Sequence, residues 1–541
     1  MATQLMTSCP ISPNVSESSG MPKPGRKAGR FLIALFGCSA AMLAASSAAL
    51  AVTYNSSIYP SAAEVRKTSE VSFTETSETL TYGFDTAFPT PTRKTFFVES
   101  YGGSSNGTTN NTGPFYSAVA AAKACGVPAE VVFKKTGRYY FASNTSKGSD
   151  AYAILRVKNA NNLLIRGQGV ATKLIFGDPA LGGLFISDSK TVMIKDFSID
   201  YNPLGFTQGT IVSMDATAGS FVLRVHDGYP TPIAIQSTIP PYYHYGYVIN
   251  KSGTYKWPAM VGVTITGMSL LSGSDWTLTA DPTALAGYMA VGDDFIYEGR
   301  RTEQQALSAG NISGFYLKNV SVYASPTCGL GLSNLDGVNI DGYADMIPTG
   351  SNRLLATNAD GLFCSGVRDR VTIKNCSFNG QGDDCMNLHI YGYPNYYLTL
   401  TSDTNITFQN RLNLRIGDLL EVMNPTTGEI KGQVAVASVT QVGATATQCT
   451  LAAGLSTVGY NSATDWIYPL SLSCSNFKIV HNYFGQNRSR GVLIGARRGI
   501  IQANTFENAE GYGINLGHGG TQWGTGVTPS DVTIRNNIFR T

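Results

Sequence analysis

Apolar and polar residues alternate along this chain in short units that recur. Six segments share an alternating strand, a polar turn containing Asn or Asp, and a bulky apolar residue. They are VMIKDFSI from Val192, FYLKNVSV from Phe315, VTIKNCSF from Val371, FKIVHNYF from Phe477, GIIQANTF from Gly499 and VTIRNNIF from Val532. A period of two residues is typical of strands, so each unit predicts a short β-strand followed by a turn.

A second element follows most copies of the first, at a spacing in the low twenties of residues. Its copies are CGLGLS from Cys328, DGLFCS from Asp360, DCMNLH from Asp384, RGVLIG from Arg490 and YGINLG from Tyr512. Such a period, built of strands and turns, predicts a parallel β-helix whose coils stack about 4.8 Å apart. A β-sandwich is the alternative, but the hairpin turns that it needs are scarce in this region.

Within the second element, alternate residues are expected to point into the coil. The inward set is Leu362, Cys364, Met386, Leu388, Val492, Ile494, Ile514 and Leu516. The outward set is Phe363, Asn387, His389, Leu493 and Asn515. Asn387 and His389 on the outward face indicate a surface that binds a polar ligand.

The rest of the chain predicts additions to an all-β fold. An Ala-rich amphipathic stretch, 114–125, predicts a short helix that caps the open end of the β-helix. Two stretches without the coil rhythm, at about 205–300 and 395–470, predict small β-rich, barrel-like insertions. The predicted organisation is a signal peptide at 1–51, a lead-in segment at 52–94 and a parallel β-helix catalytic domain at 95–541.

The N-terminal segment has the pattern of an export signal. The basic stretch KPGRKAGR precedes the apolar run FLIALFGCSAAMLAASSAALA, which ends in an Ala-x-Ala cleavage pattern. An uncleaved membrane anchor is the alternative, but small residues in the second half of the run favour cleavage. We therefore predict an exported protein, periplasmic or extracellular, without stable membrane insertion once the signal is removed.

Charge and cysteine content exclude several function classes. The net charge is +3, and the basic leader accounts for it, so no basic surplus indicates a nucleic-acid partner. Seven cysteines beyond the leader are too few and odd in number for a disulfide scaffold. The five histidines show no metal-ligand spacing, so neither a metal nor a cofactor is predicted. The oligomeric state is not encoded in these features.

Three carboxylates stand out because only 14% of the residues are charged. In the stacked register, Cys328, Asp360, Asp384, Arg490 and Tyr512 form one column, and Asp383 lies beside Asp384. Neighbouring carboxylates resist joint ionisation, and a protonated and an ionised carboxyl side by side can cleave a glycosidic bond. The alternative is structural, because Asp and Asn also stack in turns and bond backbone N–H groups.

The ordered motifs resemble those of glycoside hydrolase family 110. They are YASPTCGLGLSNLDGVNIDGY, RLLATNADGLFCSGVRDRVTIKNCSFNGQGDDCMNLH, NRSRGVLIG and the closing DVTIRNNIF after Trp523. The resemblance implies an exported, right-handed parallel β-helix that acts as an exo-α-1,3-galactosidase, with inversion and without a metal. Its substrate would be a galactose-containing glycan or polysaccharide.

The resemblance also implies roles for individual residues. The essential carboxylates correspond to Asp360, Asp383 and Asp384, without an assignment of acid and base. The expected sugar-binding residues are Arg353, Asn387, His389, Arg488, Arg490, Glu510 and Trp523. Glu510 is included because this chain has WGTG where the family carries an acidic residue after the late tryptophan.

Two other functions fit the same fold. A polygalacturonase-like pectin hydrolase would share the NADG and GDD motifs, but the expected Arg-x-Lys motif is missing and no basic groove is indicated. A non-catalytic glycan-binding β-helix would keep the groove and tolerate loss of the aspartates. Replacement of Asp360 and Asp384 by Asn separates an enzyme from a binding protein.

Overall fold

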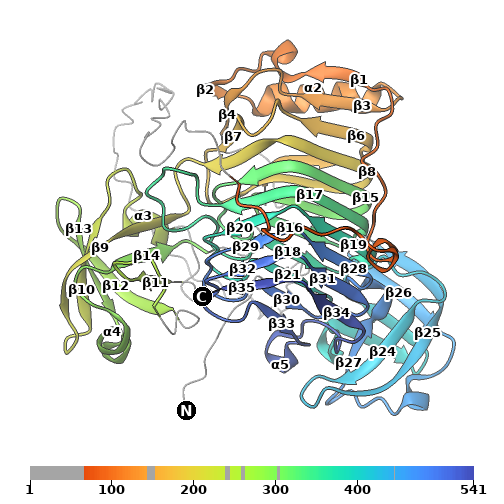
Figure 1. Cartoon of the computed structure of the whole chain (residues 1–541). Helices are drawn as coiled ribbons and strands as arrows, with labels where there is room; N and C mark the ends of the chain where they lie inside the picture. The colour runs from red at the N-terminus through yellow and green to blue at the C-terminus, as the bar shows by residue number, and fades with distance from the viewer. Residues whose placement is uncertain are drawn as a thin grey trace, which may run out of the picture.

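The chain folds into a stack of coils built from three parallel strand ladders (Figure 1). The computed structural model describes residues 66–142, 153–237, 244–256, 262–300, 305–443 and 445–540. The expected signal peptide and the first part of the lead-in lie outside the described residues. In the part of the chain that is described, no helix is long and apolar enough to cross a membrane.

The first ladder carries the strands of the repeated first element. It contains β1 (Lys94–Phe97), β3 (Ala129–Val132), β6 (Asn161–Arg166), β8 (Gly182–Tyr201), β15 (Leu307–Val322), β17 (Asp336–Met346), β19 (Arg368–Lys374), β28 (Phe477–Val480), β31 (Gly499–Gln502) and β34 (Val532–Arg535).

The second ladder follows the turn that ends each first element, and it shares the long strands β8, β15 and β17. Its other members are β2 (Asn106–Asn110), β4 (Gly137–Phe141), β7 (Thr172–Phe176), β20 (Ser377–Asn379), β29 (Tyr483–Phe484), β32 (Thr505–Glu507) and β35 (Ile538–Arg540).

The third ladder carries the second element and shares β8 and β15. Its other members are β5 (Ala153–Lys158), β16 (Leu330–Ser333), β18 (Leu362–Ser365), β21 (Met386–His389), β30 (Val492–Ile494) and β33 (Ile514–Leu516). The predicted parallel β-helix is therefore confirmed.

Backbone conformation explains why the turn of the repeat is polar. The residue after each first strand has a positive φ, between 53° and 61° in the examples Asp196, Asn319, Asn375, His481 and Asn536. L-residues rarely adopt this left-handed conformation, and Asn and Asp tolerate it best. This conformation at the corner of the coil explains why Asn and Asp recur in the turn of the repeat.

The predicted inward residues pack in the core. Leu362, Met386 and Val492 are fully buried and belong to one continuous apolar cluster, whereas Leu516 of β33 is 42% exposed near the end of the stack. Phenylalanine rings stack along the interior, with centroid separations of 5.3 Å for Phe378–Phe484, 4.8 Å for Phe484–Phe506 and 4.9 Å for Phe506–Phe539.

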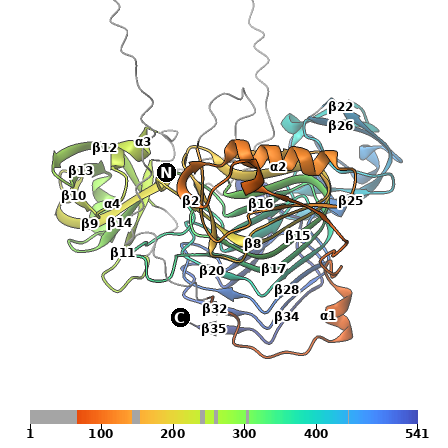
Figure 2. The ribbon, with the colours of Figure 1, turned by 90° about the horizontal axis from the view of Figure 1, so that it is seen from above.

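Helix α2 (Thr112–Ala124) lies against the first coil at one end of the stack (Figures 1 and 2). It buries Phe115, Ala118 and Val119 against that coil, next to the short 3-10 helix η1 (Val98–Tyr101). Phe115 stacks on Phe133 with ring centroids 6.1 Å apart.

Two β-rich units project from the stack. The first is a closed antiparallel barrel, β10-β13-β12-β11-β14-β9, on the left of Figure 1. Its elements are β9 (Phe206–Asp215), β10 (Ser220–Val225), α3 (Pro232–Gln236), β11 (Tyr245–Ile249), β12 (Val263–Ser272), β13 (Asp275–Ala280), α4 (Pro282–Tyr288) and β14 (Asp294–Glu298).

The second unit is a six-stranded antiparallel sheet with its own apolar cluster, at the lower right of Figure 1. Its elements are η4 (Asn395–Tyr397), β22 (Leu398–Ser402), β23 (Asn405–Phe408), β24 (Leu419–Asn424), β25 (Glu429–Val442), β26 (Ala446–Leu451), η5 (Leu455–Val458), β27 (Trp466–Pro469) and η6 (Leu470–Leu472).

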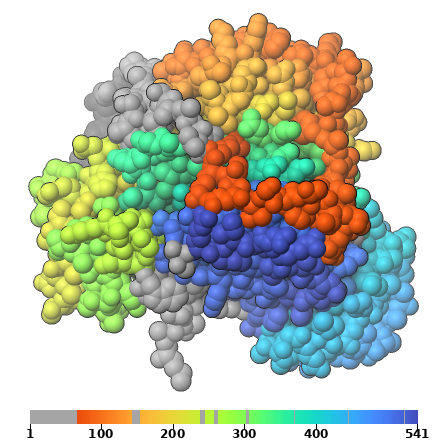
Figure 3. Space-filling view, in the orientation of Figure 1, coloured from red at the N-terminus to blue at the C-terminus, as the bar shows by residue number. Residues whose placement is uncertain are grey.

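Residues 66–93 run across the outside of the coils, from the last coil to the first (Figure 3). We call this segment the strap; it contains α1 (Ser77–Thr81). At its start Glu70 binds Arg540 of β35, and near its middle Glu75 and Asp85 bind the buried Lys478 of β28. At its end Arg93 donates to the carbonyl oxygen of Asn162, 2.7 Å away. The strap therefore contacts strands at both ends of the stack.

Candidate active site

The predicted column of residues stands in register. Backbone hydrogen bonds of 2.9 Å link Gly329 to Asp360, Gly361 to Asp384, and Cys385 to Arg490. The strands that follow continue the same register, with Leu362 beside Met386 and Met386 beside Val492. Asp360, Asp384 and Arg490 therefore occupy equivalent positions on three successive coils, as the sequence predicted.

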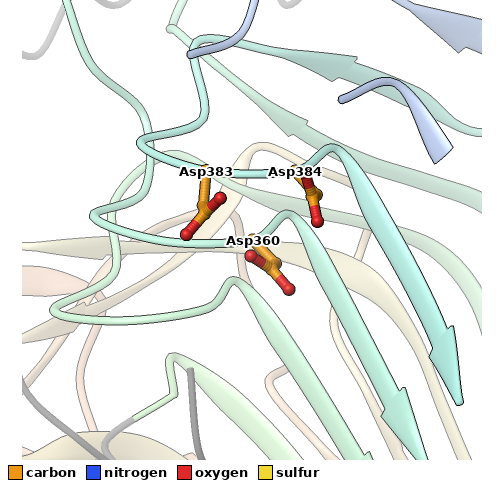
Figure 4. A group of neighbouring side chains, drawn as sticks. All are labelled: Asp360, Asp383 and Asp384. Carbon is orange, nitrogen blue, oxygen red and sulfur yellow. The ribbon is translucent and has the colours of Figure 1, made fainter. Parts of the chain in front are cut away.

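Three carboxylates meet at this corner (Figure 4). One oxygen atom each from Asp360, Asp383 and Asp384 lie within 4.8 Å of one another. The backbone carries Asp383 and Asp384 side by side before β21, and Asp360 on the adjacent coil before β18. Asp360 and Asp384 are completely buried and Asp383 is 4% exposed. Turn-forming aspartates on a surface would not be buried together in this way.

Asp383 is held by two arginines. Both terminal nitrogens of Arg300 donate to Oδ2 of Asp383 at 3.0 Å, and Nη2 of Arg488 lies 3.2 Å from the same oxygen. Arg488 also donates from Nε to the carbonyl oxygen of Gly382, and its guanidinium lies over the ring of Tyr247 at 4.7 Å. These contacts fix Asp383 in one orientation.

Asp384 is held on one side only. Its Oδ1 accepts from the backbone nitrogen of Arg490 at 3.0 Å and from Nε of the same residue at 2.7 Å. Oδ2 of Asp384 is buried and has no hydrogen-bond partner among the described residues. A buried acceptor without a partner is costly, so this atom is suited to bind a group that a ligand supplies.

The two adjacent carboxyls differ in proton affinity. Burial raises the pKa of Asp384, and the neighbouring Asp383 carboxylate adds to this effect against the charge of Arg490. Burial alone would raise the pKa of Asp383 too, but Arg488, Arg300 and Arg490 outweigh it, so that pKa is lowered. In the ligand-free protein a proton on this pair therefore resides on Asp384.

The three carboxylates have the spacing of a cation site, and their neighbours disfavour that use. Asp383 shares its Oδ2 with Arg300 and Arg488, and Asp384 shares its Oδ1 with Arg490. A cation at the centre would face three guanidinium charges at short range. The donor set fits a site that handles protons better than one that holds a resident metal.

Asn387 and His389 lie on the outward side of β21, yet both are 1% exposed, so the expected open surface is not present there. The ring of His389 packs against two other rings. Its centroid lies 4.9 Å from that of Tyr391 and 4.8 Å from that of Phe363. The repeat predicts only that these two side chains point out of the coil. Aromatic side chains then pack on His389 and bury it.

Both side chains keep polar atoms for a ligand. Nδ1 of His389 donates to Oδ1 of Asn387 at 2.8 Å, because an amide oxygen accepts only. Nε2 of His389 and Nδ2 of Asn387 are buried and have no hydrogen-bond partner in the described structure. Burial lowers the pKa of His389 to about 3, so its ring is a neutral acceptor at Nε2. Together they offer one acceptor and one donor on β21, the strand that follows Asp384.

Arg353 has a structural position that the sequence did not predict. Its two terminal nitrogens each donate to one carboxylate oxygen of Asp200 at 2.9 Å, and one also donates to the carbonyl oxygen of Tyr323 at 2.8 Å. The pair is buried, with 0% and 4% of the side chains exposed. This guanidinium is held by contacts inside the fold, and the expected role of Arg353 in sugar binding stays a prediction.

Glu510 and Trp523 are both partly exposed. Burial raises the pKa of Glu510, whose backbone nitrogen donates to the carbonyl oxygen of Asn487 on the adjacent coil. Trp523 ends the short helix α5 (Gly520–Trp523), which follows β33. The described contacts place neither side chain among the three aspartates, and their roles stay predictions.

Sequence reasoning missed the residues that the barrel supplies. Glu298 ends β14, and Arg300 follows two residues later; both are buried, at 0% and 1% exposure. Tyr247 of β11 donates from its hydroxyl to Oε1 of Glu298 at 2.6 Å. The run FIYEGRR, with charges next to an apolar strand at the end of an insertion, was the available signal.

Comparison with known proteins agrees with this picture. A family model described as a right handed beta helix region matches residues 439–541. An α-1,3-galactosidase A of Bacteroides thetaiotaomicron is 24% identical over 74% of this chain and 72% of its own. An α-1,3-galactosidase A of Shewanella woodyi is 21% identical over 74% of this chain and 67% of its own.

The chain resembles the α-1,3-galactosidases of glycoside hydrolase family 110. This similarity confirms the resemblance inferred from the motifs and supports the assignment to the glycosidases. Among solved structures, the catalytic unit of a GH87 α-1,3-glucanase from Streptomyces thermodiastaticus covers 84% of this chain and 48% of its own, at 12% identity. The TM-score of 0.35 is too low to bear on function.

Proposed function

We propose that this protein releases terminal α-linked galactose from glycans by hydrolysis, with α-1,3 linkages as the preferred class. The observation that carries the proposal is the meeting of Asp360, Asp383 and Asp384 within 4.8 Å in a buried corner. The similarity to α-1,3-galactosidases over about three quarters of the chain supports the choice of sugar and linkage.

The geometry supports acid–base catalysis by the aspartates. Glycosidases need one carboxylic acid to protonate the leaving oxygen and one carboxylate to activate water or attack the sugar. Asp384 and Asp383, with pKa values moved in opposite directions, supply the two states in the ligand-free protein. Asn387 and His389 would bind sugar hydroxyls through the polar atoms that accept or donate no hydrogen bond within the described residues.

Inversion is proposed from the family resemblance and needs its own test. Inverting enzymes separate their two carboxyl groups by about 6.5–9.5 Å, and the nearest oxygens of these three aspartates are closer than that. Proton NMR of the first sugar released decides the matter. Initial β-galactose from an α-galactoside supports inversion, and initial α-galactose shows retention.

The function is tested with the purified full chain on α-1,3-, α-1,4- and α-1,6-linked galactose disaccharides, with polygalacturonate alongside. We expect galactose from the α-1,3 substrate at the highest kcat/KM. Release of galacturonate would favour the pectin hydrolase. Binding of galactosides without any hydrolysis would favour a glycan-binding protein, and either result overturns the proposal.

A further inference from the structure

Glu298 is a completely buried carboxyl beside the aspartates to which no role has been given. It is the last residue of β14 and pairs with Phe206 of β9 at the edge of the barrel. Arg300, which binds Asp383, follows in the same segment. The end of the barrel therefore places one carboxyl, Glu298, and one guanidinium, Arg300, at the corner of the coil.

The side chain of Glu298 packs on the backbone that carries the catalytic pair. A methyl group at Gly382 would come within 2.9 Å of its Oε2 and within 2.8 Å of the carbonyl oxygen of Asn358. Gly382 is followed directly by Asp383. Oε1 of Glu298 accepts from Tyr247, and Oε2 has no hydrogen-bond partner among the described residues.

Glu298 and Asp383 share two cations. The charges of Arg300 and Arg488 act on both carboxyls. Arg488 also contacts the backbone of Gly382 and lies over Tyr247, so it joins the two carboxyl sites physically. At this corner Glu298, Asp360, Asp383 and Asp384 face Arg300, Arg488 and Arg490. These four carboxyls and three guanidinium groups form one buried cluster of opposing charges.

Among the described residues, titratable groups from several elements face Glu298. They are Tyr245 and Tyr247 from β11, Tyr255 after it, Arg300 after β14, Arg488 before β30, and Asp383. Burial raises the pKa of all three tyrosines, so they stay neutral. Burial also raises the pKa of Glu298 to about 7, against the opposing effects of Arg300, Arg488 and the hydroxyls of Tyr247 and Tyr245.

We propose that Glu298 is a positioning residue that acts on Asp383 through Arg300 and Arg488. When Glu298 is neutral, Asp383 is the only one of these two carboxyls that carries a charge, and both guanidinium groups hold it in the productive orientation. When Glu298 is ionised, it draws on the same two charges, and Asp383 is held less firmly. The inference rests on the proposed function and adds a pH-sensitive control supplied by the barrel.

The test is the pH dependence of kcat/KM in E298Q. Glutamine keeps an oxygen that accepts from Tyr247 and cannot ionise. In the wild type we expect a decline of about tenfold between pH 6 and pH 8 from this single ionisation, and E298Q should lack that decline. Near pH 5.5 the two proteins should have similar activity. A uniform loss at every pH, or a pH–rate profile of E298Q that superimposes on that of the wild type, overturns the proposal.

The variant Y247F should shift the pH at which kcat/KM declines. The hydroxyl of Tyr247 stabilises the ionised form of Glu298, so Y247F should raise the pKa of Glu298 and move the decline to higher pH. A decline at an unchanged pH in Y247F contradicts the inference even if E298Q does not fold.

A measurement without substrate separates this inference from the proposed function. Because the pKa of Glu298 is higher in the folded than in the unfolded chain, its contribution to stability is lost as pH rises toward and through about 7. The Tm of E298Q relative to wild type should therefore increase from pH 5 to pH 8. A constant Tm difference overturns the Glu298 inference; a wild type inert on all α-galactosides overturns the proposed function instead.

Discussion

Asp384 accepts hydrogen bonds from both the backbone N–H and the side-chain Nε of Arg490. Arg490 lies 106 positions later, on the neighbouring coil. This double contact joins the strand that carries the aspartate pair to the next strand of the ladder. It also fixes which oxygen of Asp384 remains available, because Oδ1 accepts both bonds and Oδ2 accepts none from the described residues.

Replacement of the three aspartates tests their role most directly. D360N, D383N and D384N preserve size, so we expect folded proteins whose kcat/KM falls by about 10²–10⁴. D341N is a matched control, because Asp341 accepts from Asn375 on the outer side of the coil, away from the corner. Circular dichroism checks the fold, and galactose release measures the rate. Full turnover by all three variants would show that the chemistry lies elsewhere.

The same variants assign acid and base. A variant that lacks the acid should recover activity on substrates whose leaving group needs no proton, such as activated aryl galactosides. A variant that lacks the base should be rescued by azide, which replaces the activated water. An identical response of D383N and D384N to both treatments contradicts separate roles for the pair.

Arg490 should set the pH at which Asp384 changes charge. Its guanidinium lowers the pKa of Asp384, so R490Q should raise that pKa and move the corresponding limb of the pH–rate profile to higher pH. R490K keeps a positive charge and should lie between R490Q and the wild type. A limb that does not move would mean that Asp384 does not control the profile.

Arg353 should contribute to stability without a direct effect on the reaction. R353M leaves the buried carboxylate of Asp200 without its partner, which typically costs about 3–5 kcal/mol in the free energy of unfolding. Urea unfolding measures the loss, and KM of the folded protein should change by less than about twofold. A large rise in KM with little loss of stability would instead support the predicted role in sugar binding.

His389 should destabilise the fold in acid. Its pKa is about 3 in the folded protein, below the value of the unfolded chain, so the unfolded chain binds more protons between these limits. Stability is therefore lost as pH falls from about 6.5 toward 3. The Tm of H389Q relative to wild type should rise across that fall, and H518Q, which changes a partly exposed histidine, is the comparison. Equal acid sensitivity of H389Q and wild type would contradict a neutral, buried ring.

The phenylalanine stack should stabilise the coils unequally. Phe484 is fully buried between Phe378 and Phe506, so F484A should lower the free energy of unfolding by about 3–5 kcal/mol. Phe539 at the last coil is 57% exposed, and F539A should cost clearly less. Chemical denaturation of both variants measures the difference, and equal losses would contradict it.

The sequence predicts the coil and its corner well because both depend on a local period. The residue that takes a positive φ must tolerate that conformation, and the inward positions must be apolar, so the register that joins Asp360, Asp384 and Arg490 can be read from the pattern. The arginine pair on Asp383 is different. Arg488 lies in a predicted coil motif, whereas Arg300 comes from an insertion whose placement no repeat encodes.

Burial of the outward face was also beyond the pattern. Alternation shows that Asn387 and His389 point out of the coil, but not that both are buried or that Tyr391 packs on His389. The pairing of Arg353 with Asp200 joins residues 153 positions apart, and no periodicity relates them. These contacts depend on packing between segments, which a strand pattern does not specify.

The strap makes the two ends of the stack depend on each other. Coils in a linear array can fray one at a time from an end, because each contacts only its neighbours. Here Glu70 at the start of the strap binds Arg540, so loosening of that coil also frees the start of the strap, while its contacts with Lys478 and Asn162 hold the rest. During synthesis the strap emerges long before its anchor at Arg540 exists. The contact between Glu70 and Arg540 can therefore form only after the coil that carries Arg540 has been translated.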